Sequence, residues 1–356
     1  LPTHTPGADA TGLAKVAFVA PRPLTISAVK TSLRPTIMPT QPLTPGFSYR
    51  RGPHWVALLA AFLTWPLLIS GARVTTNRVG MAVPDWPTTF GINMFVYNMF
   101  DAPWGVYIEH SHRLFGSAVG IAAIVLAAWL AIAEPRRWMK AMGVVALLAV
   151  IVQGLIGGTR VLKNSTYYAA IHGCTGQLVF ALLVGICVLT SRGWIEAKSP
   201  ESDPDHLRRR AAVTSLLIYI QIVVGSLLRH FGAALVVHSV LAAAVWGHVA
   251  WLTFRVERHE RFVHPLVVPA RIMAALVSLQ VSLGIVAWWM LRPFDGIARL
   301  VTNPQALARS GHVVNGALLL AASVVLTLRA FRHLSTPAVS NSPSLSPASR
   351  PLEAVA

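Results

Sequence analysis

The chain has 356 residues, of which 54% are hydrophobic and only 12% are charged, and its mean hydropathy is +0.58. Soluble domains carry about 25% charged residues, so this composition excludes an ordinary water-soluble fold. The net charge of +17 is compatible with nucleic-acid binding. However, the lysines and arginines stand in short clusters between apolar runs, which is typical of the loops of a membrane protein. We therefore expect the lipid bilayer as a partner, and no nucleic acid.

The first 52 residues differ from the rest of the chain. Residues 1–52 are rich in Pro, Thr and Ala and contain one acidic residue, Asp9, which predicts a disordered extension. The scarcity of acidic residues also resembles a transit peptide. Alternatively, this part is not translated, because residue 1 is leucine and Met38 stands just ahead of the first apolar run. Residues 331–356 are predicted to form a disordered tail.

Eight apolar runs of roughly 18 to 24 residues follow the extension, each long enough to cross a bilayer as a helix. The predicted spans are 54–72, 110–132, 139–158, 167–191, 212–229, 233–254, 270–291 and 310–330. Pro66 is expected to kink the first span. Basic residues concentrate in the connections after the second, fourth and sixth spans, so the positive-inside rule places both termini in the cytoplasm. The sequence thus predicts an all-α, polytopic protein of the cell (inner) membrane.

A repeat underlies these spans. Three odd-numbered spans contain a glutamine followed four residues later by a glycine: Gln153/Gly157, Gln221/Gly225 and Gln280/Gly284. Odd-numbered spans also end on the outer side with an arginine: Arg73, Arg160, Arg229 and Arg292. Even-numbered spans open with a histidine: His112, His172, His238 and His312. We therefore predict two pseudo-symmetric four-helix bundles, residues 54–191 and 212–330, with sites between or within the repeats.

The four histidines are predicted to lie at similar depth near the outer face. Each has a small residue four positions later, on its own side of the helix: Gly116, Gly176, Ala242 and Gly316. A flat macrocycle needs this clearance, so we predict two bis-histidine haem sites. Hydrogen bonds to neighbouring helices are the simpler alternative, but they do not explain four equivalent positions. Zinc is a further alternative, but the sites lack the thiolates or carboxylates that complete its shell.

Charged residues near the histidines are candidates for ligand binding and catalysis. Guanidinium groups bind carboxylates bidentately, so Arg113, Arg160 and Arg229 are candidates to hold haem propionates, with snorkelling to the interface as the alternative. Glu109, three residues before His112, has no carboxylate counterpart at the other histidines. A buried carboxylate can accept a proton or stabilise a cation, whereas an ion pair with Arg113 is the simpler interpretation.

Two further histidines stand beside these residues. His110 is expected to be a neighbour of the site rather than a ligand, and His230, next to Arg229, is a candidate to assist propionate binding.

Four motifs in this chain resemble the haem A synthase family: Glu109-x-x-His112-Arg113, Pro84-Asp85-Trp86-Pro87, Gly157-Gly158-Thr159-Arg160 and Leu228-Arg229-His230. The resemblance covers roughly residues 54–330 and implies an eight-span membrane enzyme that oxidises haem O to haem A for cytochrome oxidase. Many family members carry a cysteine pair in an outer loop. Here the two cysteines, Cys174 and Cys187, fall inside one apolar run, so the chain resembles the cysteine-free branch.

The resemblance also implies roles for individual residues. His112 and His172 would hold the substrate haem O in the N-terminal half, with Glu109 as the catalytic carboxylate beside the methyl group. His238 and His312 would ligate a haem b in the C-terminal half. The implied reaction is two successive hydroxylations of the C8 methyl, and the resulting gem-diol dehydrates to the formyl group. Haem O synthase and an electron donor or acceptor are the implied partners, and a homo-oligomer stays open.

Two other classes of protein share some of these features. A di-haem electron carrier of the cytochrome b type requires the same histidines but not Glu109. A transporter built from repeats would contain Gly- or Pro-interrupted helices at mid-membrane, whereas the polar residues here cluster at the outer ends of the spans.

Overall fold

The structure is a computed structural model that describes residues 49–197, 200–203, 206–291 and 301–335. Its long helices are α1 (Arg51–Thr76), α2 (Trp104–Ala133), α3 (Arg137–Leu162), α4 (Thr166–Thr190), α6 (Leu207–Phe231), α7 (Leu235–Arg258), α8 (Glu260–Leu291) and α9 (Asn303–His333). The short helix α5 (Arg192–Ile195) and the parallel strands β1 (Glu201–Ser202) and β2 (Leu334–Ser335) complete the described elements. Eight helices are apolar and long enough to cross a membrane, which confirms the predicted all-α, multi-pass membrane fold.

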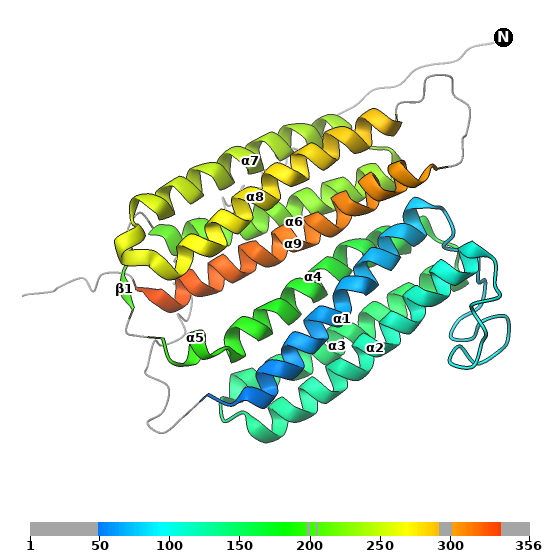
Figure 1. The fold of residues 1–356 in the computed structure, drawn as a ribbon, viewed down its shortest axis with the longest axis horizontal. Coiled ribbons are helices and arrows are strands. Elements are labelled where there is room, and N and C mark those ends of the chain that lie inside the picture. The colour runs from blue at the N-terminus through cyan, green and yellow to red at the C-terminus, as the bar shows by residue number, and fades with distance from the viewer. Residues whose placement is uncertain (1–48, 198–199, 204–205, 292–300, 336–356) are drawn as a thin grey trace, which may run out of the picture. The chain divides into compact units, whose positions relative to one another are not determined.

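The helices pack in two sets of four. In the first set, α1 contacts α2, α2 contacts α3, α3 contacts α4, and α4 contacts α1 again. Helices α6, α7, α8 and α9 form a second cycle of the same kind. The two sets meet where α9 packs against α4 and α1, and where α6 packs against α4 (Figure 1). Each half of the repeat predicted from the sequence therefore corresponds to one closed set of helices.

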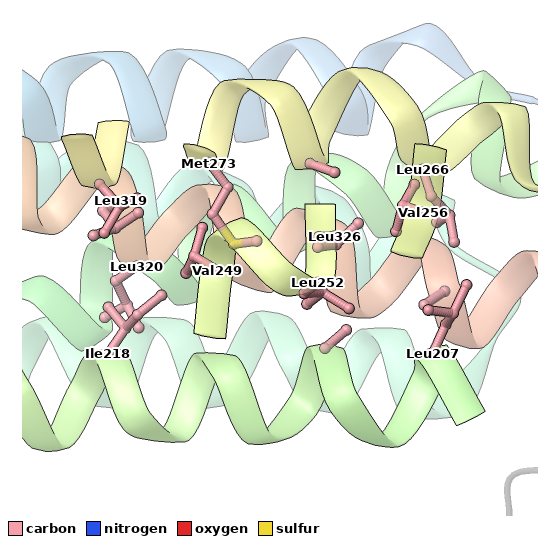
Figure 2. Packing of buried hydrophobic residues seen from close by; sticks show 14 of the residues in the cluster. Leu207, Ile218, Val249, Leu252, Val256, Leu266, Met273, Leu319, Leu320 and Leu326 are labelled. Carbon is pink, nitrogen blue, oxygen red and sulfur yellow. The ribbon is translucent and has the colours of Figure 1, made fainter. Parts of the chain in front are cut away.

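Each set of helices has its own apolar core. Figure 2 shows the core of the second set, in which side chains of all four helices interdigitate: Leu207, Ile218, Val249, Leu252, Val256, Leu266, Met273, Leu319, Leu320 and Leu326. The first set is filled around Leu126, Leu130, Met139, Leu183 and Ile186. Other large apolar side chains stay exposed, such as Ile132, which is 85% exposed. Such surfaces are expected where a helix faces lipid, because acyl chains are as apolar as the side chains themselves.

Several helices extend beyond the predicted spans, and the largest difference is at the start of α8. The seventh span was expected to begin at residue 270, but α8 already begins at Glu260 and contains Pro265 and Pro269. Pro269 has no N–H, so the carbonyl four residues earlier loses its helical donor. Arg329 of α9 compensates, because its Nη1 donates to the Pro265 carbonyl at 3.1 Å. Helix α1 likewise contains Pro66 and continues to Thr76.

Some predictions fall outside the described residues. These are the N-terminal extension up to residue 48, the tail beyond residue 335, and the second long outer connection from residue 292 to residue 300, including Arg292.

The turn between α2 and α3, in the first helix set, contains a buried ion pair. Arg136 Nε donates to Glu134 Oε1 at 2.7 Å, and both terminal nitrogens of Arg136 donate to the Leu189 carbonyl at 3.1 Å. Both charged residues are less than one-tenth exposed. This contact ties the turn between α2 and α3 to the end of α4.

Candidate functional site

The four predicted histidines come together as two pairs. The ring centroids of His112 (α2) and His172 (α4) are 6.1 Å apart, with an interplanar angle of 86°. Those of His238 (α7) and His312 (α9) are 6.3 Å apart, at 71°. Each pair joins two helices of one set, α2 with α4 and α7 with α9, so the two halves of the repeat build the same arrangement.

The spacing of both pairs suits one metal between two imidazoles. A metal–nitrogen bond to histidine is about 2 Å long, and the ring centroid lies about 1 Å behind the nitrogen, so the two centroids of such a pair are about 6 Å apart. In the described part of the chain, no cluster of three or more His, Cys, Asp or Glu side chains could hold a metal ion by itself. A haem iron needs only two protein ligands, because the macrocycle supplies the others. The residues present therefore fit a bis-histidine haem better than zinc.

A glycine on the preceding helix faces each histidine ring. A Cβ atom added at Gly71, Gly157, Gly225 or Gly284 would lie 2.7, 2.9, 2.9 or 3.0 Å from Cε1 of His112, His172, His238 or His312, respectively. Carbon atoms in contact lie about 3.5–4.0 Å apart, so only glycine leaves room for the rings in these positions. These four glycines, on α1, α3, α6 and α8, thus set the distance between each of these helices and the histidine that it faces.

The residue four positions before each of these glycines fixes the histidine from the other side. Nδ1 of His112 lies 3.1 Å from the Leu67 carbonyl, and Nδ1 of His312 lies 3.1 Å from the Gln280 carbonyl. A carbonyl only accepts, so Nδ1 carries the hydrogen and Nε2 keeps its lone pair for a metal. Nε2 of Gln280 also lies 3.2 Å from Nε2 of His312, so metal binding there requires this amide to turn away.

The remaining two glutamines contact the backbone of their histidines through their side-chain amides. The Gln153 amide donates to the His172 carbonyl at 2.7 Å and lies 3.0 Å from Nδ1 of its ring. The Gln221 amide donates to the His238 carbonyl at 2.9 Å.

The glutamine amides also change the interpretation of the small residues four positions after the histidines, which were predicted to give clearance for a macrocycle. Cβ atoms at Gly176 and Gly316 would lie 3.0 and 3.3 Å from the amide nitrogens of Gln153 and Gln280. These two small residues therefore make room for a glutamine, whereas at Gly116 the nearest atom would be Leu67 Cδ1, at 3.9 Å.

Glu109 is buried in a network that also includes the outer connection between α1 and α2. The residue is 2% exposed, and Arg113 Nη2 donates to its Oε1 at 3.1 Å. Its other oxygen accepts a hydrogen bond from the backbone N–H of Val83 at 3.0 Å. The ion pair that was the simpler interpretation of Glu109 is therefore present, and the carboxylate is also a fixed contact of the outer loop.

Arg113 and His110 hold the same loop. Arg113 Nη1 donates to the carbonyls of Asp85 and Thr88 at 2.7 and 2.8 Å, and Nη2 donates to that of Val83 at 2.9 Å. His110 is fully buried, and its Nδ1 lies 3.1 Å from the Thr89 hydroxyl. The side-chain hydrogen bonds of Arg113 are thus made to the loop and to Glu109. His110 contacts the same loop.

Asp85 organises the loop from within. Its carboxylate accepts hydrogen bonds from the backbone N–H groups of Phe90 and Gly91, at 2.8 and 2.9 Å, and from the Thr88 hydroxyl. Desolvation opposes ionisation of this group, but the hydrogen bonds outweigh it and lower the pKa of Asp85 from 3.8 to about 2.

The motif Gly157–Arg160 of α3 meets the loop that contains the motif Pro84–Pro87. A Cβ atom at Gly158 would lie 2.5 Å from the Trp86 ring, so this glycine admits the tryptophan of the loop. Arg160, two residues later, lies so close to Gly80 that a Cβ there would be 1.6 Å from its Nη2. Gly157, Gly158 and Arg160 thus contact a histidine, the loop tryptophan and the loop backbone, respectively.

Arg229 and Arg73, near the ends of α6 and α1, make contacts that differ from those of Arg160. Arg229 of α6 donates to the Ala72 carbonyl at 3.0 Å and to the Thr76 hydroxyl at 2.8 Å, which joins the two helix sets. Arg73 lies over the Trp104 ring at 5.8 Å.

Sequence reasoning missed the contact residues around the histidines. The repeat of glutamine and glycine was recognised, but its function was not, and the first span was left out because Leu67 stands where the others have glutamine. Gly71, at the shared offset, was the available signal.

Comparison with known proteins identifies the family of the chain. The sequence model of a family described as cytochrome oxidase assembly protein matches residues 54–239, more than half of the chain. The chain belongs to the haem A synthase family. The match to the family includes Glu109, His112, His172 and His238, and it ends before His312. The assignment of His312 therefore depends on its pairing with His238 in the structure.

Individual relatives carry the family name. A protein named "Heme A synthase" from Staphylococcus haemolyticus (strain JCSC1435) is 27% identical over 197 residues, which cover 52% of this chain and 61% of the relative. A namesake from Shouchella clausii (strain KSM-K16) is 29% identical over 182 residues, or 48% and 56% of the two chains. Another, from Listeria monocytogenes serotype 4a (strain HCC23), is 28% identical over 132 residues, or 36% and 41%. The chain thus spans about two-fifths to three-fifths of the length of these curated relatives.

Proposed function

We propose that this protein is a haem A synthase, which oxidises the C8 methyl group of haem O to a formyl group in two successive hydroxylations. One observation supports this most directly. The two histidine pairs match in spacing, but among the residues that the structure describes, only the pair of His112 and His172 has a buried carboxylate, Glu109, three residues from a ligand candidate. A protein that only transferred electrons between two equal haems would not need this asymmetry.

In the N-terminal half, His112 and His172 hold the substrate haem O between their imidazole rings. At His172 this requires the Gln153 amide, which lies 3.0 Å from Nδ1, to turn away so that Nδ1 carries the hydrogen and Nε2 is free. Glu109 stabilises positive charge that develops at the methyl carbon, and water then adds to that carbon. Arg113 and the Val83 amide fix the position of this carboxylate, since each donates to one of its oxygens. The second hydroxylation gives a gem-diol, which loses water to leave the formyl group.

In the C-terminal half, His238 and His312 hold a haem b. A bis-histidine haem supplies one-electron transfer, because its iron has no open position for substrate. The Gln280 carbonyl orients the His312 ring, and the Gln221 amide holds the backbone of His238. The electrons removed from the substrate methyl leave the protein toward a separate electron acceptor.

The surroundings of the protein follow from the same proposal. We place it in the cell (inner) membrane with both termini in the cytoplasm and both histidine pairs toward the outer face, because basic residues concentrate on the opposite side. Haem O synthase is the expected supplier of the substrate, and self-association into a homo-oligomer is compatible with this arrangement.

A second function is favoured by one observation. Glu109 is bonded to Arg113 and Val83, so it also serves to fasten the outer loop. In a di-haem cytochrome of the b type, that structural role would be its whole function.

Substitution of Glu109 separates the two functions. Glu109→Gln keeps the shape of the side chain, and the protein is expected to retain its haem spectrum but to form no haem A in a host that makes haem O. The measurement is extraction of the haems followed by mass analysis, in which the product has gained one oxygen and lost two hydrogens. Glu257→Gln, which removes a surface ion pair with Arg271, is the matched control. Normal haem A formation by the Glu109 variant would favour the cytochrome function.

A further inference from the structure

A cleft of about 180 Å³ opens at the outer ends of α1, α3, α4 and α6. Its described ionisable lining residues are all basic: Arg78 follows α1, Arg160 lies in the last turn of α3, and His230 lies in the last turn of α6. None of the described residues that line the cleft is acidic. A concave site with this lining suits an anion.

The cleft lies one helical turn outward from the pair of His112 and His172. On α1, Val74 and Thr75 line it, three and four residues after Gly71, which contacts the His112 ring. On α3, Arg160 stands three residues after Gly157, which contacts His172. One turn advances a helix by about 5.4 Å, so the cleft begins where a group bound between the two rings would present its outer edge.

The basic side chains here are not neutralised by other contacts. The side chains of Arg78 and Arg160 donate no hydrogen bond to any residue that the structure describes, in contrast to those of Arg113 and Arg229. Arg160 is close enough to His112, His172 and His230 to interact with them electrostatically. Glu109 also acts on Arg160 over a longer range, but its hydrogen bonds are made to Arg113 and Val83.

We infer that Arg160, Arg78 and His230 form the subsite for the carboxylate (propionate) groups of the haem between His112 and His172, an inference that rests on the proposed function. Guanidinium groups recognise carboxylates through paired charge-assisted hydrogen bonds, and a haem carries its two carboxylates on one edge. Of the three arginines that the sequence nominated for this role, Arg160 is the one with free donors beside a cleft. The phosphate of a lipid headgroup shares this oxyanion chemistry, so the test separates the two sources.

The test compares haem with its dimethyl ester, in which both carboxylates are uncharged. Both are titrated into the purified full-length protein in lipid nanodiscs, and the bis-histidine spectrum is followed. His238→Ala in every sample removes one ligand of the second pair. The protein with wild-type residues at the cleft is expected to bind haem about ten- to a hundredfold more tightly than the ester. This ratio corresponds to the free energy of hydrogen bonds to charged groups. Arg160→Gln and Arg78→Gln should reduce this ratio toward one while the affinity for the ester stays unchanged.

The controls decide between the alternatives. Lys163→Gln removes a positive charge near the same helix end but outside the cleft, and should keep the ratio, while Arg160→Lys should keep part of it. An unchanged ratio in Arg160→Gln, or an equal loss of haem and ester, would overturn the inference. A loss of haem preference when anionic phosphatidylglycerol replaces zwitterionic phosphatidylcholine would also overturn it, because an anionic lipid headgroup would then be the occupant. If neither compound gives a bis-histidine spectrum with the cleft intact, the proposed function fails instead.

Discussion

The contact between Gly157 and His172 allows a sharp test of the histidine geometry. In Gly157→Ala, the new methyl group would lie 2.9 Å from Cε1 and 3.2 Å from Nδ1 of the ring. Carbon contacts normally measure about 3.5–4.0 Å, so the ring must retreat by about 0.5–1 Å. Metal–ligand distances tolerate only about 0.2 Å, and displaced supporting contacts typically cost about 10–100-fold in metal affinity. We therefore expect haem binding in the first helix set to fall by about that factor.

The same helix provides the control. Gly154 stands one turn earlier on α3, and a Cβ there would have no neighbour within 4 Å. Alanine generally favours a helix interior over glycine by about 1 kcal/mol, so Gly154→Ala should leave folding and haem binding intact. A loss confined to Gly157→Ala would then come from the ring contact rather than from the helix.

The assay is a haem titration of the purified variants, read from the low-spin spectrum, together with thermal unfolding without haem. Gly225→Ala should weaken the other haem site in the same way, because its methyl would lie 2.9 Å from Cε1 of His238. Equal haem affinity and equal spectra in Gly157→Ala and Gly154→Ala would refute the reasoning, since the ring could then not be held where a metal needs it.

Two further predictions concern the ends of the helix sets. Asp85 has a lowered pKa in the folded protein, so its contribution to loop stability should be complete above pH 4 and be lost as the pH falls from about 4 to about 2. Amide exchange of Phe90 and Gly91, corrected for its intrinsic pH dependence, should show this transition, and Asp85→Asn should abolish it. Arg136→Met leaves Glu134 buried without its partner and should lower the free energy of unfolding by about 3–5 kcal/mol. Denaturant unfolding measures this, and a midpoint equal to that of wild type would contradict it.

The sequence predicted the membrane-spanning helices because length and apolar composition suffice to define them. It also nominated the four histidines, since a repeat fixes which residues share a depth. The start of α8 was not predictable in this way. The carbonyl that Pro269 leaves without a helical donor is satisfied by Arg329, a residue sixty-four positions later than Pro265. The residues next to a proline in the sequence do not indicate whether a distant side chain, such as that of Arg329, will donate to the carbonyl.

The outer loop was beyond sequence reasoning for the same reason. Its position depends on hydrogen bonds from Arg113 to three backbone carbonyls and from Val83 to Glu109, and such bonds have no periodicity along the chain. The arginines illustrate the limit well. Charge and position made Arg113, Arg160 and Arg229 candidates for carboxylate binding, with the repeat favouring Arg160 and Arg229, yet the structure gives each a different environment.

The two helix sets share their ring spacing, and they differ in what surrounds it. A glycine faces every histidine ring, so this contact belongs to the common scaffold. Glu109 and Arg113 occur beside one pair only, and both bind the outer loop. Under the proposed function, the carboxylate that acts on the substrate is therefore the same group that receives the Val83 N–H. The loop cannot leave α2 without removing one of the two hydrogen bonds that position this carboxylate, so the contact between the loop and α2 is part of the proposed reacting site.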